Sequence, residues 1–229
     1  MIEFIERSCP LCGLSNIENI LVEQNIDQNE DRSRHTFSAR KIPEFSHSRM
    51  VVCQNCDLSY ANPAPELGWI RENYVDAPFV AGEESRYAAR NHARLLHKIL
   101  PNLPDRNRAL DIGTSDGVFL LELKDAGFSE VVGVEPSRAS ACQAPDSVRH
   151  LIDENFFDGS NYEPGTYSLV TCFQVLEHVD DAAELTHAVF RLLKPGGVFL
   201  TVSHDFRSFT ARILGHRSPI FDLAHLQLF

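Results

Sequence analysis

Apolar and polar residues follow two alternating patterns over the second half of the chain. Short apolar runs bounded by turn residues, typical of strands, lie at 109–113, 130–136, 147–152, 167–175 and 196–203. Between them, apolar residues recur at helical spacing over 118–126, 137–143 and 181–193. Because apolar strands that alternate with helices form sheets covered on both faces, the pattern predicts an α/β fold with a doubly wound, mainly parallel, Rossmann-like sheet.

The first half of the chain has a different pattern. A proline-rich break, "NPAPELG", lies at 62–68. Apolar residues then recur at helical spacing from about Glu83 to Leu100, where "PNLPD" ends the pattern. Since prolines in such clusters interrupt helices and mark loops, we expect a small N-terminal lobe over 1–66, a helical linker segment over 67–106 and a sheet domain over 107–229.

Charge and composition narrow the class of partner. The formal net charge of −11 disfavours binding to the phosphate backbone of nucleic acid over a broad surface. The N-terminus, "MIEFIERSCP", carries acidic residues and no long apolar run, so it does not have the pattern of a signal peptide. No apolar stretch approaches the length of a membrane span. We therefore expect a cytoplasmic protein with neither a nucleic acid nor a membrane partner.

Four of the six cysteines form two pairs with the spacing of metal ligands. Cys9 and Cys12 lie in "CPLCG", and Cys53 and Cys56 lie in "CQNCD". Each CxxC turn directs two thiolates at one ion, and two such turns complete a tetrahedron of soft ligands that suits Zn²⁺. A redox-active or coincidental pair is the alternative. Because a closed Cys₄ site leaves no open position for chemistry, we expect structural zinc that folds the N-terminal lobe.

The stretch "LDIGTSDG" at 110–117 marks the turn from the first strand of the sheet domain into a helix. It lacks the GxGxxG spacing of dinucleotide-binding turns. Asp111 is placed to accept from an ammonium group, and Gly113 allows a ligand to lie against the backbone. Glu135, which ends the second strand in "GVEPS", is placed to accept from both hydroxyls of a ribose. Ammonium, ribose and close backbone approach together indicate S-adenosylmethionine (SAM).

Four motifs in order make the resemblance specific. "LDIGTSDGVFL", "GVEPS", "FQVLEHV" and "RLLKPGGVFLTV" resemble the class I SAM-dependent methyltransferases over roughly residues 85–205. With the two CxxC pairs, the chain is similar to the zinc-containing C-methyltransferases that act on nucleotide-linked deoxysugars. The departure is Ser115, where most of the superfamily has a second glycine.

The resemblance implies roles for individual residues. The cradle for the methionine and ribose parts of SAM comprises Asp111, Gly113, Ser115 and Gly117, and Glu135 binds the ribose. Asn155 or Phe156 flanks the adenine, and Gln174 lines the methyl-transfer channel. Phe156 as a core residue and Glu135 as a solvated strand end are the alternatives.

A general base is needed wherever the methyl acceptor must lose a proton, and histidine has a suitable pKa. His178, His204 and His225 are the candidates. His225 lies in the tail "SPIFDLAHLQLF", which resembles the acceptor-facing segment of the deoxysugar C-methyltransferases, although Phe221 and Ala224 replace its polar neighbours. His178 in "LEH" is a second catalytic candidate or a structural residue at a strand end.

Two other functions are compatible with the sequence. One alternative is an NAD-dependent oxidoreductase or epimerase on a similar sheet, and the other is a non-catalytic zinc-ribbon binding module.

The end of the chain departs from the methyltransferases that it resembles. Their sheet normally ends with an antiparallel hairpin, but here Ser203 is followed by "RSFTARILG", which has a helical pattern, and by a short tail. We therefore expect five parallel strands with an incomplete edge, as in a fragment of a longer protein, and self-association through that edge.

Overall fold

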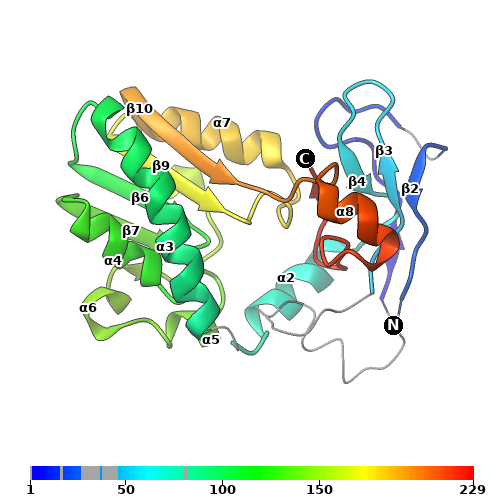
Figure 1. Cartoon of the computed structure of the whole chain (residues 1–229), viewed down its shortest axis with the longest axis horizontal. Helices are drawn as coiled ribbons and strands as arrows, with labels where there is room; N and C mark the ends of the chain where they lie inside the picture. The colour runs from blue at the N-terminus through cyan, green and yellow to red at the C-terminus, as the bar shows by residue number, and fades with distance from the viewer. Residues whose placement is uncertain (1, 16–17, 27–36, 38–45, 80–81) are drawn as a thin grey trace. The chain divides into compact units, whose positions relative to one another are not determined.

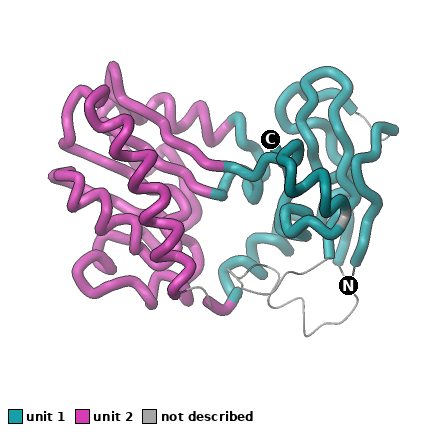
Figure 2. Tube along the Cα trace, in the orientation of Figure 1, with its two compact units in different colours: residues 1–77, 174–183, 203–229 teal, residues 78–173, 184–202 magenta. Residues whose placement is uncertain are grey.

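The computed structural model describes residues 2–15, 18–26, 37, 46–79 and 82–229. The chain divides into two compact units (Figure 2). The first comprises residues 1–77, 174–183 and 203–229, and the second comprises residues 78–173 and 184–202. In this division the expected linker segment is split, with residues 67–77 in the first unit and residues 78–106 in the second. Residues 174–183 and 203–229 of the expected sheet domain belong to the first unit. The polar run "EQNIDQNEDRSRH" at 23–35, which the sequence predicts to be a loop or an irregular insert, lies outside the described residues from 27 onward.

The second unit contains a five-stranded sheet in which every described pairing is parallel. In the order of the sheet, its strands are β10 (Leu193–Val202), β9 (Tyr167–Phe173), β6 (Arg108–Ile112), β7 (Glu130–Val134) and β8 (Ile152–Asp153). The expectation of a mainly parallel α/β sheet with five strands is confirmed. β10 is an edge strand of this sheet.

Helices cover both faces of the sheet (Figure 1). α3 (Gly82–Ile99) and α4 (Val118–Asp125) lie on one face, and α7 (Ala182–Leu192) lies on the other. Right-handed connections require this arrangement, because β6–α4–β7 and β9–α7–β10 step across the sheet in opposite directions. A cluster of buried side chains, among them Leu96 and Leu120, packs α3 and α4 against the sheet. The short elements are the 3₁₀ helices η1 (Leu100–Asn102) and η2 (Gly159–Asn161) and the helix α5 (Arg138–Ala141).

The strand expected over 147–152 is wrong for its first half. Residues Asp146–Arg149 form a helical turn, α6, and only Ile152–Asp153 pair with β7. Pro145 is the N-cap residue and Asp146 lies in the first turn, where a negative charge is favourable. These local signals favour a helix more than the short apolar run favours a strand.

The first unit contains two small sheets. β1 (Phe4–Ile5) pairs with β5 (Ala64–Pro65). The other sheet has the order β11-β4-β3-β2, with β11 (Gln227–Leu228), β4 (Ser59–Ala61), β3 (Met50–Val52) and β2 (Ile20–Val22). Its helices among the described residues are α2 (Leu67–Val75), α8 (Phe209–Leu214) and η3 (Gly215–Arg217). The last strand of the chain therefore lies beside the first half of the sequence.

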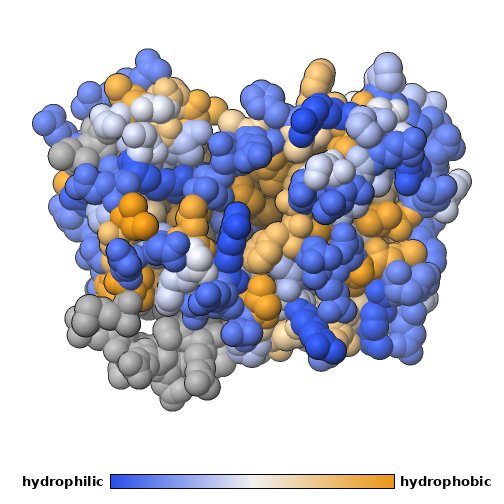
Figure 3. Space-filling view, turned by 180° about the vertical axis from the view of Figure 1, so that it is seen from behind, coloured by the Kyte–Doolittle hydropathy of each residue, from blue (hydrophilic) through white to orange (hydrophobic). Residues whose placement is uncertain are grey.

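The surface is mostly polar on the face drawn in Figure 3, where hydrophobic side chains form small separate groups. Within the described part of the chain, no helix combines the length and the hydropathy that a membrane span requires.

Candidate functional site

The glycine-rich turn follows β6 and has a left-handed backbone at three positions. Gly113, Ser115 and Gly117 have φ values of 74°, 53° and 68°. The N–H groups of Gly113 and Thr114 donate to the carbonyl oxygen of Val134 at 2.9 and 3.0 Å. The turn is thus held against the end of β7. Glycine adopts such φ values at little cost, whereas Ser115 adopts its value against its steric preference.

Glu135 directly follows β7 and contacts the glycine-rich turn through its side chain. Its side chain is only 1% exposed and accepts hydrogen bonds from the N–H groups of Ser115, at 3.0 Å, and Ser137, at 2.8 Å. Burial raises its pKa to about 7, although both hydrogen bonds oppose the shift. The negative charges of Asp111 and Asp116 raise the pKa further. Glu135 is therefore a buried acceptor rather than a solvated strand end.

Asp111, in β6 just before the turn, is a second buried carboxylate. Burial raises its pKa to about 6, although a 2.6 Å hydrogen bond from the hydroxyl of Thr171 opposes the shift. Among the described residues, neither Asp111 nor Glu135 forms an ion pair with a lysine or arginine. Two buried carboxylates without a protein cation favour a positively charged ligand, which restores the electrostatic balance on binding.

Asp116 has different contacts from Asp111 and Glu135. The hydroxyl of Ser85, near the start of α3, donates to its carboxylate at 2.6 Å. Asp116 also accepts from the N–H of Val118 at the start of α4, at 3.4 Å. It therefore joins two helices to the glycine-rich turn. The sequence pattern did not indicate the Ser85 contact.

The residues expected around the adenine lie just after β8. The side-chain amide of Asn155 donates a hydrogen bond to the carboxylate of Asp153, the last residue of β8. The side chain of Phe156 is exposed, with 44% of the residue accessible to solvent. The hydroxyl of Tyr162 donates to the other Asp153 oxygen at 3.0 Å. Phe156 is therefore a surface residue rather than a core residue. The sequence pattern did not single out Asp153. Its position as an acid at the end of a strand, like that of Glu135, could have indicated it.

Gln174, His178, His204 and His225 come together in the first unit. The ring of His225 lies 4.8 Å from that of His178 and 5.1 Å from that of His204, measured between ring centroids. Gln174 has a left-handed backbone, with φ of 55°, and its side-chain nitrogen lies 3.5 Å from Nε2 of His204. A non-glycine residue in this region is a recurrent feature of functional sites. We refer to the three histidines as the histidine cluster.

Hydrogen bonds fix the tautomers of two histidines. Nδ1 of His178 lies 3.0 Å from the carbonyl oxygen of Ala224, and Nδ1 of His225 lies 2.7 Å from that of Ile220. Because a carbonyl only accepts, Nδ1 carries the proton in both rings and Nε2 retains a lone pair. Burial lowers the pKa of His204, although the charge of Glu177 opposes this shift. The lowered pKa makes His204 a weaker base than an ordinary histidine.

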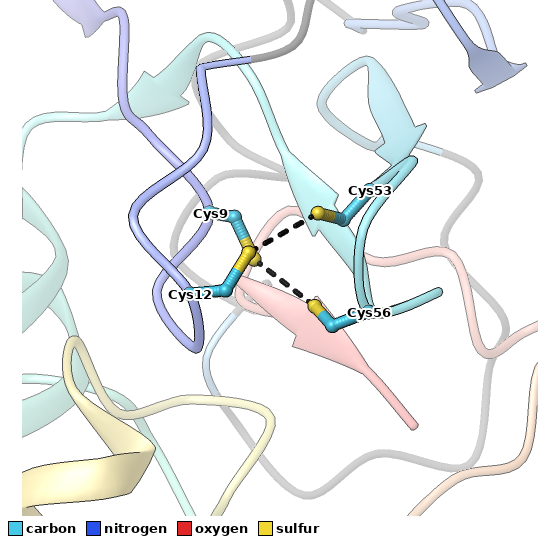
Figure 4. A group of neighbouring side chains, drawn as sticks. All are labelled: Cys9, Cys12, Cys53 and Cys56. Atoms are coloured by element: carbon cyan, nitrogen blue, oxygen red, sulfur yellow. Dashed lines mark hydrogen bonds between the residues drawn. The ribbon is translucent and has the colours of Figure 1, made fainter.

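The four cysteines expected to bind a metal converge in the first unit (Figure 4). The sulfur atoms of Cys9 and Cys56 lie 3.5 Å apart, those of Cys12 and Cys53 lie 3.4 Å apart, and all four lie within 4.8 Å of one another. Zinc–sulfur bonds of about 2.3 Å in a tetrahedron require sulfur atoms about 3.8 Å apart. The set therefore fits one zinc ion.

Backbone N–H groups are directed at these sulfurs. Burial raises the pKa of the Cys9 thiol, and hydrogen bonds from the backbone of Cys12 and Leu11 oppose the shift. A backbone hydrogen bond from Leu14 lowers the pKa of Cys12 to about 6. Such hydrogen bonds favour the thiolate form that a metal requires.

The cysteine cluster and the histidine cluster are joined within the first unit. β3 and β4 flank Cys53 and Cys56, and β4 pairs with β11, which begins two residues after His225. The guanidinium of Arg7, near Cys9, donates to the carbonyl oxygens of Leu226, at 3.4 Å, and Asp180, at 3.0 Å. The N-terminal lobe therefore holds both chain segments that carry His178 and His225.

Comparison with known proteins gives the family context of this geometry. Residues 83–229 match a family model described as a methyltransferase domain. The chain is 33% identical over 119 residues to the ubiquinone biosynthesis O-methyltransferase of Alkalilimnicola ehrlichii, an alignment that covers 47% of each protein. It is 28% identical over 163 residues to a protein of the same name from Burkholderia ambifaria, covering 67% of this chain and 59% of that protein. The chain spans about half the length of the curated relatives it matches.

Among solved structures, the chain is similar to an S-adenosylmethionine-dependent methyltransferase from Mesorhizobium loti. The sequence identity is 26%, the TM-score is 0.38, and the match covers 47% of this chain and 53% of that one.

Proposed function

From the premise that the chain belongs to the family of methyltransferase domains, we propose that it transfers the methyl group of SAM to a small-molecule acceptor. The observation that carries this proposal is the pair of buried carboxylates at the glycine-rich turn, Asp111 and Glu135. SAM has an ammonium group, a sulfonium group and a ribose diol, so its charge and its donors complement two buried acceptors. Bound SAM supplies an electrophilic methyl group, and the protein supplies orientation and proton transfer.

We assign the residues of the second unit to the cofactor. Asp111 accepts from the ammonium group, and Glu135 accepts from the ribose hydroxyls. Gly113, Ser115 and Gly117 shape the backbone against which the ligand lies. Asn155 and the exposed ring of Phe156 flank the adenine.

The histidine cluster is assigned to the acceptor. His225, whose Nδ1 carries the proton, removes a proton from the acceptor through Nε2, and His178 is the second candidate for this role. Gln174 orients His204 at the entrance to the methyl-transfer channel. His178 and Gln174 follow the carboxyl end of β9, and His204 follows that of β10. Ligands of doubly wound sheets bind beyond these strand ends, which supports the assignment.

Two acceptor classes remain candidates. The cysteine cluster, which resembles that of the deoxysugar C-methyltransferases, supports C-methylation beside the keto group of a nucleotide-linked deoxysugar. The similarity to ubiquinone biosynthesis O-methyltransferases supports O-methylation of a small molecule. Both reactions require removal of a proton from the acceptor, which is the role assigned to the histidine cluster.

The test is a methyl-transfer screen with labelled SAM across keto-deoxysugar nucleotides, phenols and small amines. His225→Ala should lower turnover on the verified acceptor about 10²–10⁴-fold and leave the affinity for S-adenosylhomocysteine (SAH) unchanged. His178→Ala is measured in parallel, and His187→Ala, at an exposed position on α7, is the matched control. Unchanged turnover in the His225 variant would transfer the role to His178. Unchanged turnover in both would exclude His225 and His178 as the base.

A further inference from the structure

Glu177 joins the three segments that carry the histidine cluster. It precedes His178 directly in the chain. Its Oε1 accepts a hydrogen bond of 2.9 Å from the backbone N–H of His204. Its carbonyl oxygen accepts from the N–H groups of Leu226, at 2.7 Å, and Gln227, at 3.3 Å, just after His225. One residue therefore fixes the backbone beside each of the three rings.

The second carboxylate oxygen of Glu177 is not used by these contacts. The residue is 0% exposed, and its Oε2 has no hydrogen-bond partner among the described residues. A buried carboxylate oxygen without a partner is costly, so such groups persist where a ligand or a transient charge satisfies them. The carboxylate also acts electrostatically on the ring of His204, whose protonated form it stabilises.

Of the two carboxylates that act on His204, Glu177 is the fully buried one. Asp222 is the other carboxylate that acts on His204, but it is partly exposed and its Oδ1 accepts from the N–H of Ala224 at 2.9 Å. Among the described residues, the ring of His178 also acts on His204, and it opposes protonation there. A proton taken up by the cluster would therefore face the fully buried carboxylate of Glu177.

We propose that Glu177 is a positioning residue that holds the histidine cluster in place and supplies the negative charge that stabilises the cluster after it takes the acceptor's proton. This inference rests on the proposed function. In the step it supports, the acceptor–hydrogen bond breaks and its proton moves to Nε2 of the histidine. The electron pair left on the acceptor forms the new bond to the methyl group, and the pair of the broken sulfur–carbon bond remains on sulfur. The histidine later releases the proton to solvent.

A purely structural role predicts a different result. If Glu177 only anchors the backbone of His204, glutamine replaces it well, because the amide oxygen accepts the same hydrogen bond and the backbone carbonyl is unchanged. If the negative charge of Glu177 stabilises the protonated cluster, Glu177→Gln should lose activity and Glu177→Asp should retain part of it. The variants Glu177→Gln and Glu177→Asp therefore separate the two roles.

The experiment measures NMR titrations of the histidine ring protons in the full chain, together with SAH affinity and the pH profile of kcat. Glu177→Gln should lower the titration midpoint of at least one cluster histidine by about 1 pH unit. It should lower kcat about 10–100-fold at unchanged KM and move the acidic limb of the profile to lower pH. SAH affinity should stay at the wild-type value. Asp180→Asn, on the same loop, is the matched control and should leave all titrations unchanged.

Titration midpoints of Glu177→Gln that equal the wild-type values would overturn the proposal. If that variant does not fold, Glu177→Asp decides, because aspartate keeps the negative charge. Its titration midpoints should stay at the wild-type values, and a fall of about 1 pH unit at any histidine of the cluster would overturn the proposal. Shifted titrations without methyl transfer to any acceptor would instead refute the proposed function and leave the electrostatic role of Glu177 standing.

Discussion

The backbone N–H of Ser115 donates a hydrogen bond of 3.0 Å to the carboxylate of Glu135. This contact joins the glycine-rich turn after β6 to the end of β7, the strand beside it. Ser115 has a left-handed backbone, and its N–H points toward the buried acid. The ligand-binding geometry assigned to this turn therefore depends on the conformation of one residue and the charge of another.

Glu135→Ala should weaken SAH binding by about 1–3 kcal/mol, because two ribose hydroxyls lose a charged acceptor. Asp111→Ala should weaken binding at least as much, since it removes the acceptor for the ammonium group. Calorimetric titration measures both effects. Asp125→Ala, at the exposed end of α4, is the control. Unaltered affinity in both variants would show that the cofactor site is assigned to the wrong residues.

Glu135→Gln should stabilise the ligand-free protein in a pH-dependent way. Burial raises the folded-state pKa of Glu135 to about 7, against about 4.5 in the unfolded chain. Between these values the folded state binds a proton that the unfolded state lacks, so the wild-type protein loses stability as pH rises through this window. The difference in melting temperature between variant and wild type should therefore grow from pH 4.5 to 7 and then level off. A difference independent of pH would contradict the raised pKa.

Ser115→Gly should increase the free energy of unfolding by up to about 1 kcal/mol, because glycine adopts the left-handed φ of 53° without steric cost. The matched control is Ser129→Gly, at an exposed position outside the left-handed region, which should lower stability by a few tenths to about 1 kcal/mol. Chemical denaturation measures both. A loss of stability in the Ser115 variant would mean that its side chain contributes more than its backbone strain costs.

Cys53→Ser should abolish the binding of about one zinc ion per chain. The pairing of β4 with β11 should then loosen, and hydrogen exchange at the amides of Leu226 and Gln227 should become faster. SAH binding should persist, because its assigned residues lie in the other unit. Cys142→Ser, at an exposed cysteine, is the control. Protein prepared without chelators that contains no metal would exclude the zinc site.

The edge strand β10 should support self-association, since an edge strand presents unpaired backbone groups. Thr201→Lys places a charge on an exposed position of β10 and should shift the protein toward the monomer. Sedimentation velocity over a range of concentrations measures the shift. Equal association of both proteins would exclude this edge as the interface.

The sequence by itself determined the elements whose signals are local. The alternation of apolar runs and helical patterns is sufficient to predict the parallel sheet, and each CxxC pair or strand–turn–helix unit lies within a few consecutive residues. That Asp111, Gly113 and Glu135 lie near one another could be predicted because strand ends in a doubly wound sheet meet at one edge. The error at 147–149 has the same origin, since capping by Pro145 and Asp146 competed with a short apolar run.

Only the tertiary structure decided which distant residues meet. Nothing in the sequence around His178, His204 and His225 records that their rings are neighbours, or that Glu177 binds the backbone beside each. The pairing of β11 with β4, which places His225 beside the cysteine lobe, joins the last residues of the chain to its first third. Such contacts depend on packing and hydrogen bonds between segments far apart in the chain, and residue patterns that repeat over a few positions carry no record of them. The left-handed backbone of Ser115 belongs to the same class, because hydrogen bonds to the neighbouring strand impose it.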